Sequence, residues 1–192
     1  MERCFARREE GQSLVEFALV LPILMLVVVG LIEFAFMLNA RNAVEFASRD
    51  GSMLAAEGGN IDGTDCVVLD RVDRDIVSPA TQIRISQVTI YWSDKNGAQI
   101  GNNANVYDRS GSTTCNFGSG PSITVPYTLS QANYTYGSRC DVYAGCGGSH
   151  TGVDMVGVKV TYQHRWLTSI AQWAGQFVTF AVTTATRMEP QE

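Results

Sequence analysis

Hydrophobic residues are concentrated near the N-terminal end of the chain. From Phe17 to Ile32, sixteen consecutive residues carry no charge, and the apolar run continues past Glu33 to Leu38. As a helix the sixteen residues extend about 24 Å and the longer run about 33 Å, so only the longer run crosses a bilayer comfortably. The pattern predicts a membrane-spanning helix over about residues 14–38. Glu33 must then lie near the outer interface or be shielded by a partner.

The helical pattern continues beyond the apolar run. Small and apolar residues such as Ala43 and Ala47 recur near one face, with polar residues elsewhere, until Gly58-Gly59 interrupts the periodicity. The sequence therefore predicts one continuous helix over about residues 14–56. Its first half is apolar on all sides, and its second half is amphipathic.

Shorter elements follow this helix. The apolar positions of residues 62–77 have the spacing of a helix that packs on a sheet. Residues 82–92 are rich in β-branched and aromatic side chains, and their alternation breaks at Ser86-Gln87, which predicts a strand with a bulge. Residues 94–97, Asp-Lys-Asn-Gly, predict a turn, after which residues 98–100 begin a return strand. We prefer this hairpin to a calcium loop, because the further acids and the distal glutamate of an EF-hand are missing.

Two more strands are predicted near the C-terminus. Residues 156–166 alternate cleanly between an apolar face and a polar face, and residues 177–186 form a second strand. His164 lies on the apolar face of the first strand, where a buried structural histidine is more common than a catalytic base. The predicted fold class is α+β, with a long N-terminal helix packed on a small antiparallel β-sheet of three or four strands.

Composition and charge exclude several classes of function. The 192 residues suffice for one domain and an appendage, and 45% of them are hydrophobic, which excludes a disordered chain. With 14 basic and 19 acidic residues the net charge is −5, and no basic stripe exists to bind nucleic acid. Three arginines precede the apolar run, at positions 3, 7 and 8. By the positive-inside rule they predict a cytoplasmic N-terminus and an extracytoplasmic remainder.

The cysteines fit this topology. Cys4 precedes the helix, whereas Cys66, Cys115, Cys140 and Cys146 all lie in the predicted oxidising compartment. Four cysteines allow three pairings. We favour Cys140–Cys146, which closes a small Gly-rich loop and leaves Cys66–Cys115 as the second disulfide. A zinc site is the alternative, but the chain has no CxxC pair to support it.

No group of residues predicts catalysis. The histidines are His150, which lies in a Gly-Ser loop, and His164. A Cys–His hydrolase built from Cys146 and His150 is conceivable, but disulfide formation would remove its thiolate. We therefore predict that the chain is not an enzyme and has no catalytic residue, no metal, no cofactor and no small-molecule substrate.

The junction between the polar leader and the helix gives a more specific indication of function than the composition or the cysteines. Gly11 ends the leader, and Glu16 follows five residues later at the start of the apolar helix, where an unpaired carboxylate is costly. An uncleaved anchor and a conventional signal peptide are the alternatives, although the best small-x-small site, Leu38-Asn39-Ala40, lacks its first small residue. The junction resembles the type IV prepilin signal, which prepilin peptidase cuts after the glycine. The resemblance implies that the new amine of Gln12 pairs with Glu16 during assembly, the glutamate belonging to a neighbouring subunit.

Residues 11–56 as a whole resemble the TadE/TadG-like family of minor pilins, or pseudopilins, from tight-adherence (Flp) pilus systems. Residues 60–149 carry no such resemblance. The family's usual motif Ala-Ala-Arg-Glu-Gly corresponds here to Ala47-Ser48-Arg49-Asp50-Gly51. The other elements that carry the resemblance are Gly11, Val15-Glu16-Phe17-Ala18, Leu21-Pro22, Ile32-Glu33-Phe34 and the C-terminal residues 185–190.

The resemblance implies a chain in three parts: a prepilin-type leader at 1–11, the N-terminal helix at 12–57 and a pilin-like, β-rich extracytoplasmic domain at 58–192. It implies a single-pass protein of the inner (cytoplasmic) membrane that stays there or is incorporated in the pilus. The implied partners are prepilin peptidase, other pilin or pseudopilin subunits, the pilus assembly platform and membrane lipid. The implied function is pilus assembly, or assembly of a related secretion machine, by helix packing and charge pairing. The alternative is a secreted or anchored surface adhesin or binding module with a simple N-terminal anchor.

Overall fold

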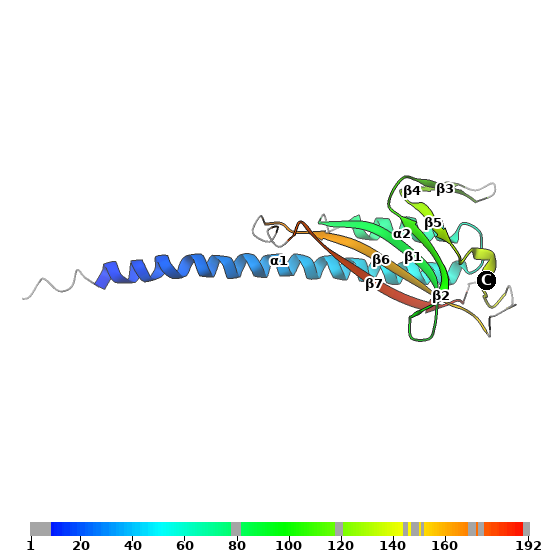
Figure 1. Ribbon diagram of the computed structural model, residues 1–192, viewed down its shortest axis with the longest axis horizontal. Helices are drawn as coiled ribbons and strands as arrows, with labels where there is room; N and C mark the ends of the chain where they lie inside the picture. The colour runs from blue at the N-terminus through cyan, green and yellow to red at the C-terminus, as the bar shows by residue number, and fades with distance from the viewer. Residues whose placement is uncertain are drawn as a thin grey trace, which may run out of the picture.

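The molecule consists of a long helix and a head that packs against the C-terminal half of this helix (Figure 1). The computed structural model describes residues 9–77, 82–117, 121–143, 146, 150, 152–168, 172 and 175–189. Helix α1 runs from Glu9 to Gly58, 50 residues in all, which corresponds to about 75 Å. The helix predicted over about residues 14–56 is confirmed and is longer at both ends. Cys4 and the rest of the leader before residue 9 lie outside the described residues.

Glycine ends α1 where the sequence predicted it. Gly59 has a φ of 51°, a conformation that favours glycine, and its N–H donates to the Ala55 carbonyl at 3.2 Å. Helix α2 follows at Thr64–Val77 and confirms the helix predicted over residues 62–77. The Thr64 hydroxyl donates to the Gly58 carbonyl at 3.2 Å, which joins the start of α2 to the end of α1.

The strands of the head form two antiparallel sheets. The large sheet has five strands in the order β5-β2-β1-β6-β7, and β3 and β4 form a separate two-stranded sheet. The α+β prediction is confirmed, but the expected number of three or four strands was too low. A short 3-10 helix, η1, lies at Tyr136–Ser138. The strands are β1 Ile83–Ser93, β2 Gln99–Asp108, β3 Thr113–Asn116, β4 Ser122–Val125, β5 Thr128–Ala132, β6 Met155–Arg165 and β7 Phe177–Arg187.

The hairpin between β1 and β2 confirms two sequence predictions. The register of β1 against β6 shifts between Ile85 and Gln87, so the bulge lies at Ser86, as predicted. In the turn, the Asp94 side chain accepts hydrogen bonds from the N–H groups of Asn96 and Ala98, at 2.8 and 2.9 Å. These contacts set the register in which β2 returns along β1.

The strands that the sequence did not predict are β3, β4 and β5. They lie in a segment rich in Gly, Ser, Thr and Asn, and β3 and β5 have no fully buried residue. A strand with little burial lacks the alternation of apolar and polar residues by which strands are recognised. The additional edge strand, β5, pairs with the second half of β2, from Asn105 to Asp108.

The core lies between the two helices and one face of the large sheet. Small residues let α1 approach its neighbours closely. A Cβ at Gly51 would lie 2.8 Å from Val72 Cγ2 of α2, and the Ser48 hydroxyl donates to the Val158 carbonyl of β6 at 2.7 Å. Ala47, Ser48 and Gly51 therefore lie on the contact face of α1, whereas Arg49 between them is exposed. Fully buried residues of this core include Val44, Ala47, Ala55, Val68, Leu69, Val72, Val88, Ile90, Val158, Val160 and Tyr127.

Candidate membrane and assembly interface

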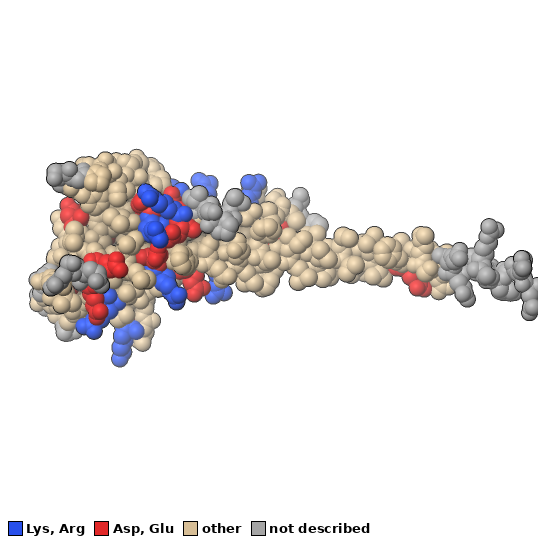
Figure 2. Space-filling view, turned by 180° about the vertical axis from the view of Figure 1, so that it is seen from behind, with Lys and Arg blue, Asp and Glu red and all other residues tan. Residues whose placement is uncertain are grey.

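The N-terminal half of α1 exposes apolar side chains on all sides. Every residue from Gly11 to Ile32 is exposed, apart from the half-buried Leu21 and Val29. The most apolar stretch of the helix has a mean hydropathy of 2.8, and none of it is buried inside the molecule. Figure 2 shows charged atoms gathered on the head, with almost none along the projecting helix. An exposed helix of this length and composition suits a single-pass membrane anchor.

The residues predicted to act in processing and assembly lie at the start of this helix. The Gln12 side-chain amide donates to Glu16 Oε1 at 3.0 Å, and both side chains are exposed. Gly11 lies within α1, and a Cβ built on it would meet nothing within 4 Å. The structure thus brings Gln12 and Glu16 together on an accessible surface one helical turn apart. Cleavage after Gly11 and charge pairing by Glu16 remain predictions.

Glu33 is shielded by the chain itself. Its side chain is buried, at 5% exposure, under the segment that follows β6. The backbone N–H of Leu167 donates to Glu33 Oε2 at 3.2 Å, and that of Thr168 donates to Oε1 at 2.5 Å. Two N–H donors compensate for much of the hydration that the carboxylate loses. From the sequence, we expected Glu33 to lie near the outer interface of the membrane or to be shielded by a partner. In the structure, backbone groups of the same chain shield it.

His164 is buried beside this contact, as its place on the apolar face of its strand predicted. The side chain is fully buried, and its ring lies edge-on to Trp166 with 5.6 Å between the ring centroids. Neither ring nitrogen has a hydrogen-bond partner among the described residues. Burial lowers the pKa of His164, and the Glu33 carboxylate opposes this shift. A neutral structural histidine fits these surroundings better than a catalytic base.

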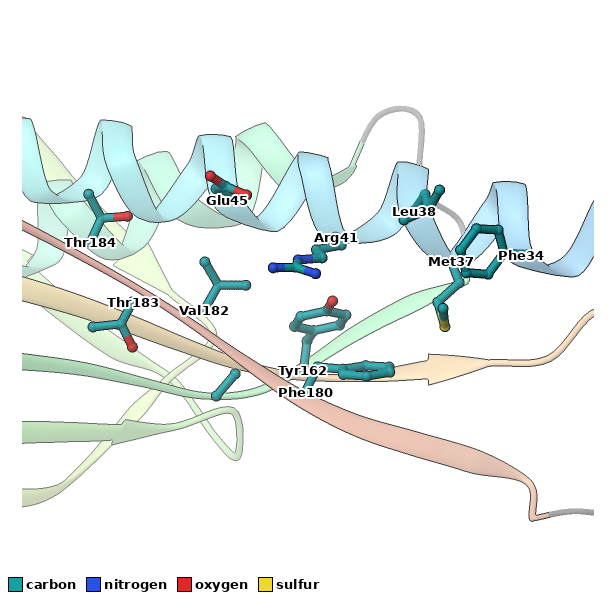
Figure 3. Close-up of a pocket in the computed structure, with 11 residues that line it drawn as sticks. Phe34, Met37, Leu38, Arg41, Glu45, Tyr162, Phe180, Val182, Thr183 and Thr184 are labelled. Carbon is teal, nitrogen blue, oxygen red and sulfur yellow. The ribbon is translucent and has the colours of Figure 1, made fainter.

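A groove of about 610 Å³ lies between α1 and the edge strand β7. Its apolar end is formed by Phe34, Met37 and Leu38 of α1, and Arg41 extends from α1 into the groove towards Tyr162 (Figure 3). A second hollow, of about 310 Å³, lies one to two helical turns closer to the N-terminus. It is lined by Leu26, Val29, Gly30, Glu33, Phe34, Met37, Trp166 and Thr168.

A buried polar network lies in the head at the start of α2, around Asp65. The Arg139 side chain is fully buried and donates to Asp65 Oδ1 at 2.5 Å. The Tyr107 hydroxyl and the Asn105 amide donate to Asp65 Oδ2 at 2.7 and 2.8 Å. Burial, assisted by Asp65, raises the pKa of the Tyr107 hydroxyl well above its usual range. Sequence reasoning missed this network because Asp65 and Arg139 are 74 positions apart.

The cysteines of the head lie in two pairs. The Cα atoms of Cys66 and Cys115 are 6.3 Å apart, and those of Cys140 and Cys146 are 5.0 Å apart. Both separations are in the range of protein disulfides. These are the two pairs that the sequence analysis favoured.

The cysteine, histidine and aspartate at 140, 150 and 154 also approach one another. Their potential ligand atoms lie within 4.8 Å of each other. The His150 ring contacts Asp154 Oδ1 at 2.6 Å and stacks on Trp92, while Asp154 Oδ2 accepts the Cys140 N–H at 3.0 Å. With the Cys140 sulfur paired to Cys146, the cluster keeps only His150 and Asp154 as ligands, fewer than the three or four that protein zinc sites have. Asp154 is the member that the sequence did not single out.

In the comparison with known proteins, the matching segment lies in helix α1 and not in the head. Residues 11–53 match the family of TadE-like proteins, so the resemblance noted in the sequence is confirmed over this segment. The matched residues all lie in α1 and include Gly11, Glu16 and Glu33. TadE-like proteins are pilus-associated structural proteins rather than enzymes. No curated protein and no solved structure matches the chain.

Proposed function

We propose that this chain, TadE-like over residues 11–53, is a membrane-anchored minor pilin, or pseudopilin. It would take part in assembling a tight-adherence (Flp) type IV pilus or a related secretion machine. The observation that carries the proposal is the N-terminal half of α1. This half is apolar and exposed on all sides, and it begins with the Gly11-Gln12 step and a carboxylate at Glu16.

The proposed first step is proteolytic processing of the leader. Prepilin peptidase cuts between Gly11 and Gln12, and Gln12 becomes the N-terminal residue. The cut removes the leader with its three arginines and creates a positively charged amine. That amine lies one helical turn from Glu16, as the present side-chain contact between Gln12 and Glu16 illustrates.

The pairing of Glu16 provides a driving force for assembly. A lone carboxylate within the apolar span is unfavourable in lipid, and a cation close to it restores a favourable partner. Pairing with the amine of an adjacent subunit sets the axial register between two helices. The surrounding apolar residues then exchange lipid contacts for contacts with other pilin helices.

The proposed topology places the N-terminus in the cytoplasm and the head outside the inner membrane. The arginines before the span support this orientation. The two cysteine pairs support it too, because disulfides persist in oxidising compartments such as the periplasm. In this position the head can contact other pilin subunits and the assembly platform while α1 holds it at the membrane.

Replacing one carboxylate tests this proposal. In cells that assemble the pilus, Glu16→Ala should leave the chain inserted in the membrane and abolish piliation. The matched control is Glu45→Ala, an exposed glutamate on the same helix outside the apolar run, which should leave piliation unchanged. Normal piliation with Glu16→Ala would contradict charge pairing. Normal piliation in cells that lack the chain altogether would favour an anchored adhesin instead.

A further inference from the structure

The end of the head where β6 passes into β7 folds back onto the apolar half of α1. The N–H groups of Leu167 and Thr168 bind Glu33, and Trp166 and Thr168 line the hollow formed with Leu26 and Gly30. Figure 1 shows this end of the sheet directed towards the projecting part of α1. The contact therefore joins the head to a part of the helix that belongs to the membrane anchor.

The position of Glu33 along α1 sets the depth of this contact. About twenty helical residues cross a hydrocarbon core of about 30 Å, so a span that begins at Leu14 ends at Glu33. Gly30 then lies about 4.5 Å and Leu26 about 10 Å below that boundary. Any span that begins later in the chain places the same residues deeper. Trp166 and Thr168 line the same hollow as Leu26 and Gly30, and the N–H of Thr168 binds Glu33, so this part of the head reaches the level of the boundary.

The chemistry of this end of the head matches a lipid surface. Leu167 is 43% exposed and Phe177, the first residue of β7, is 47% exposed, although both are apolar. No charged residue occurs between Arg165 and Arg187. Tryptophan and other amphipathic rings favour the boundary between headgroups and hydrocarbon. Arg165, exposed at the end of β6 and paired in register with Phe177, lies where a lipid phosphate would be found.

We propose that Trp166, Leu167, Thr168 and Phe177 form a second membrane contact, which we call the membrane-facing tip. The tip rests in the outer leaflet of the bilayer that α1 crosses, and Glu33 holds it there through its two N–H donors. The head then has a fixed orientation relative to the membrane rather than turning freely on a single helix. The inference rests on the proposed function only in requiring that α1 spans the membrane.

The experiment measures the depth of single nitroxide labels in the full chain. The chain carries Cys4→Ser, leaving the paired cysteines of the head unreactive, and is reconstituted in phosphatidylcholine nanodiscs. Labels are placed at Leu167→Cys and, as a matched control, at Leu129→Cys on β5, since both leucines are 43% exposed. A third label at Leu24→Cys reports on the span itself. Electron paramagnetic resonance then compares collisions with oxygen, which enters lipid, and with a water-soluble nickel complex.

The proposal predicts that the ratio of oxygen to nickel accessibility is several-fold higher at Leu167 than at Leu129, and highest at Leu24. Equal ratios at Leu167 and Leu129, with Leu24 in lipid, would overturn the membrane-facing tip and leave the anchor intact. A water-accessible Leu24 would overturn both the tip and the proposed anchor. With one copy of the chain in each nanodisc and the equally exposed Leu129 as the control for shielding by the protein, an excess of oxygen over nickel accessibility at Leu167 reports on lipid.

Discussion

In the C-terminal half of α1, residues 40–56, one face is buried against the head, and the exposed face carries the charged Arg41, Glu45 and Arg49 as well as the apolar Phe46 and Met53. The buried face is narrow and made of small or β-branched side chains such as Ala40, Val44 and Ala47. In the N-terminal half, residues 11–32, large apolar side chains are exposed on every side. One uninterrupted helix thus has two kinds of surroundings. The first half is built for an apolar environment supplied by lipid or other helices, and the second is built for a single contact face within its own chain.

The largest effect is expected where the two halves differ most in packing. Gly51→Leu should destabilise the head by about 3 kcal/mol, because the new side chain has no space beside Val72. Gly11→Leu, at the start of the other half, should leave the stability of the head unchanged, since a Cβ there meets nothing within 4 Å. Urea unfolding of the detergent-solubilised chain measures both. Equal losses for the two variants would show that α1 does not divide in this way.

A smaller effect is expected at Glu33, where the two halves of α1 meet. Glu33→Ala leaves the N–H groups of Leu167 and Thr168 without their acceptor, which should weaken the junction by about 1 to 2 kcal/mol. Hydrogen exchange at these two amides should accelerate accordingly. Glu16→Ala is the control, because Glu16 lies far along the exposed half and contacts Gln12 rather than the head. Unchanged exchange in Glu33→Ala would mean that another contact holds the segment after β6.

The smallest effect concerns pH. Burial depresses the pKa of His164 below its ordinary value of 6.5 in the folded chain. As the pH falls below that value, the unfolded chain takes up a proton that the folded chain resists, so the stability of the head should decrease. The head is therefore most stable, as far as His164 is concerned, above the pKa that His164 has in the unfolded chain. This stability is lost as the pH falls towards the lower pKa that His164 has in the folded chain. Urea unfolding across this interval should show the loss, and His164→Phe should reduce it. An identical slope in that variant would assign the pH dependence to other groups.

The sequence predicted those parts of the fold whose residues alternate or recur with a clear period. The helix α1, the bulge at Ser86 and the strands β6 and β7 all have such a pattern. The weakly buried strands β3 and β5 were missed because exposed strands need no alternation. The favoured cysteine pairs were chosen by proximity, and the structure places the same residues within disulfide reach.

The contacts of the candidate site were harder to predict than the elements that carry it. A carboxylate at position 33 showed that a compensating partner was needed, but nothing in the sequence pointed to Leu167 or Thr168, more than 130 positions away. Their backbone N–H groups bind Glu33, and any residue type except proline supplies such a donor. The ion pair between the Asp65 and Arg139 side chains was missed because the two residues are 74 positions apart. Contacts of this kind depend on how the chain folds back rather than on a local pattern.

The mature N-terminus tests the central claim most directly. The protein is purified from cells that express the prepilin peptidase of a tight-adherence system, and mass spectrometry determines its first residue. If the N-terminal half of α1 is a prepilin-type assembly helix, the mature chain begins at Gln12. An intact Met1 would instead indicate an uncleaved anchor, and a start near Arg41 would indicate a conventional signal peptide. Either result would contradict the assignment of this chain as a minor pilin.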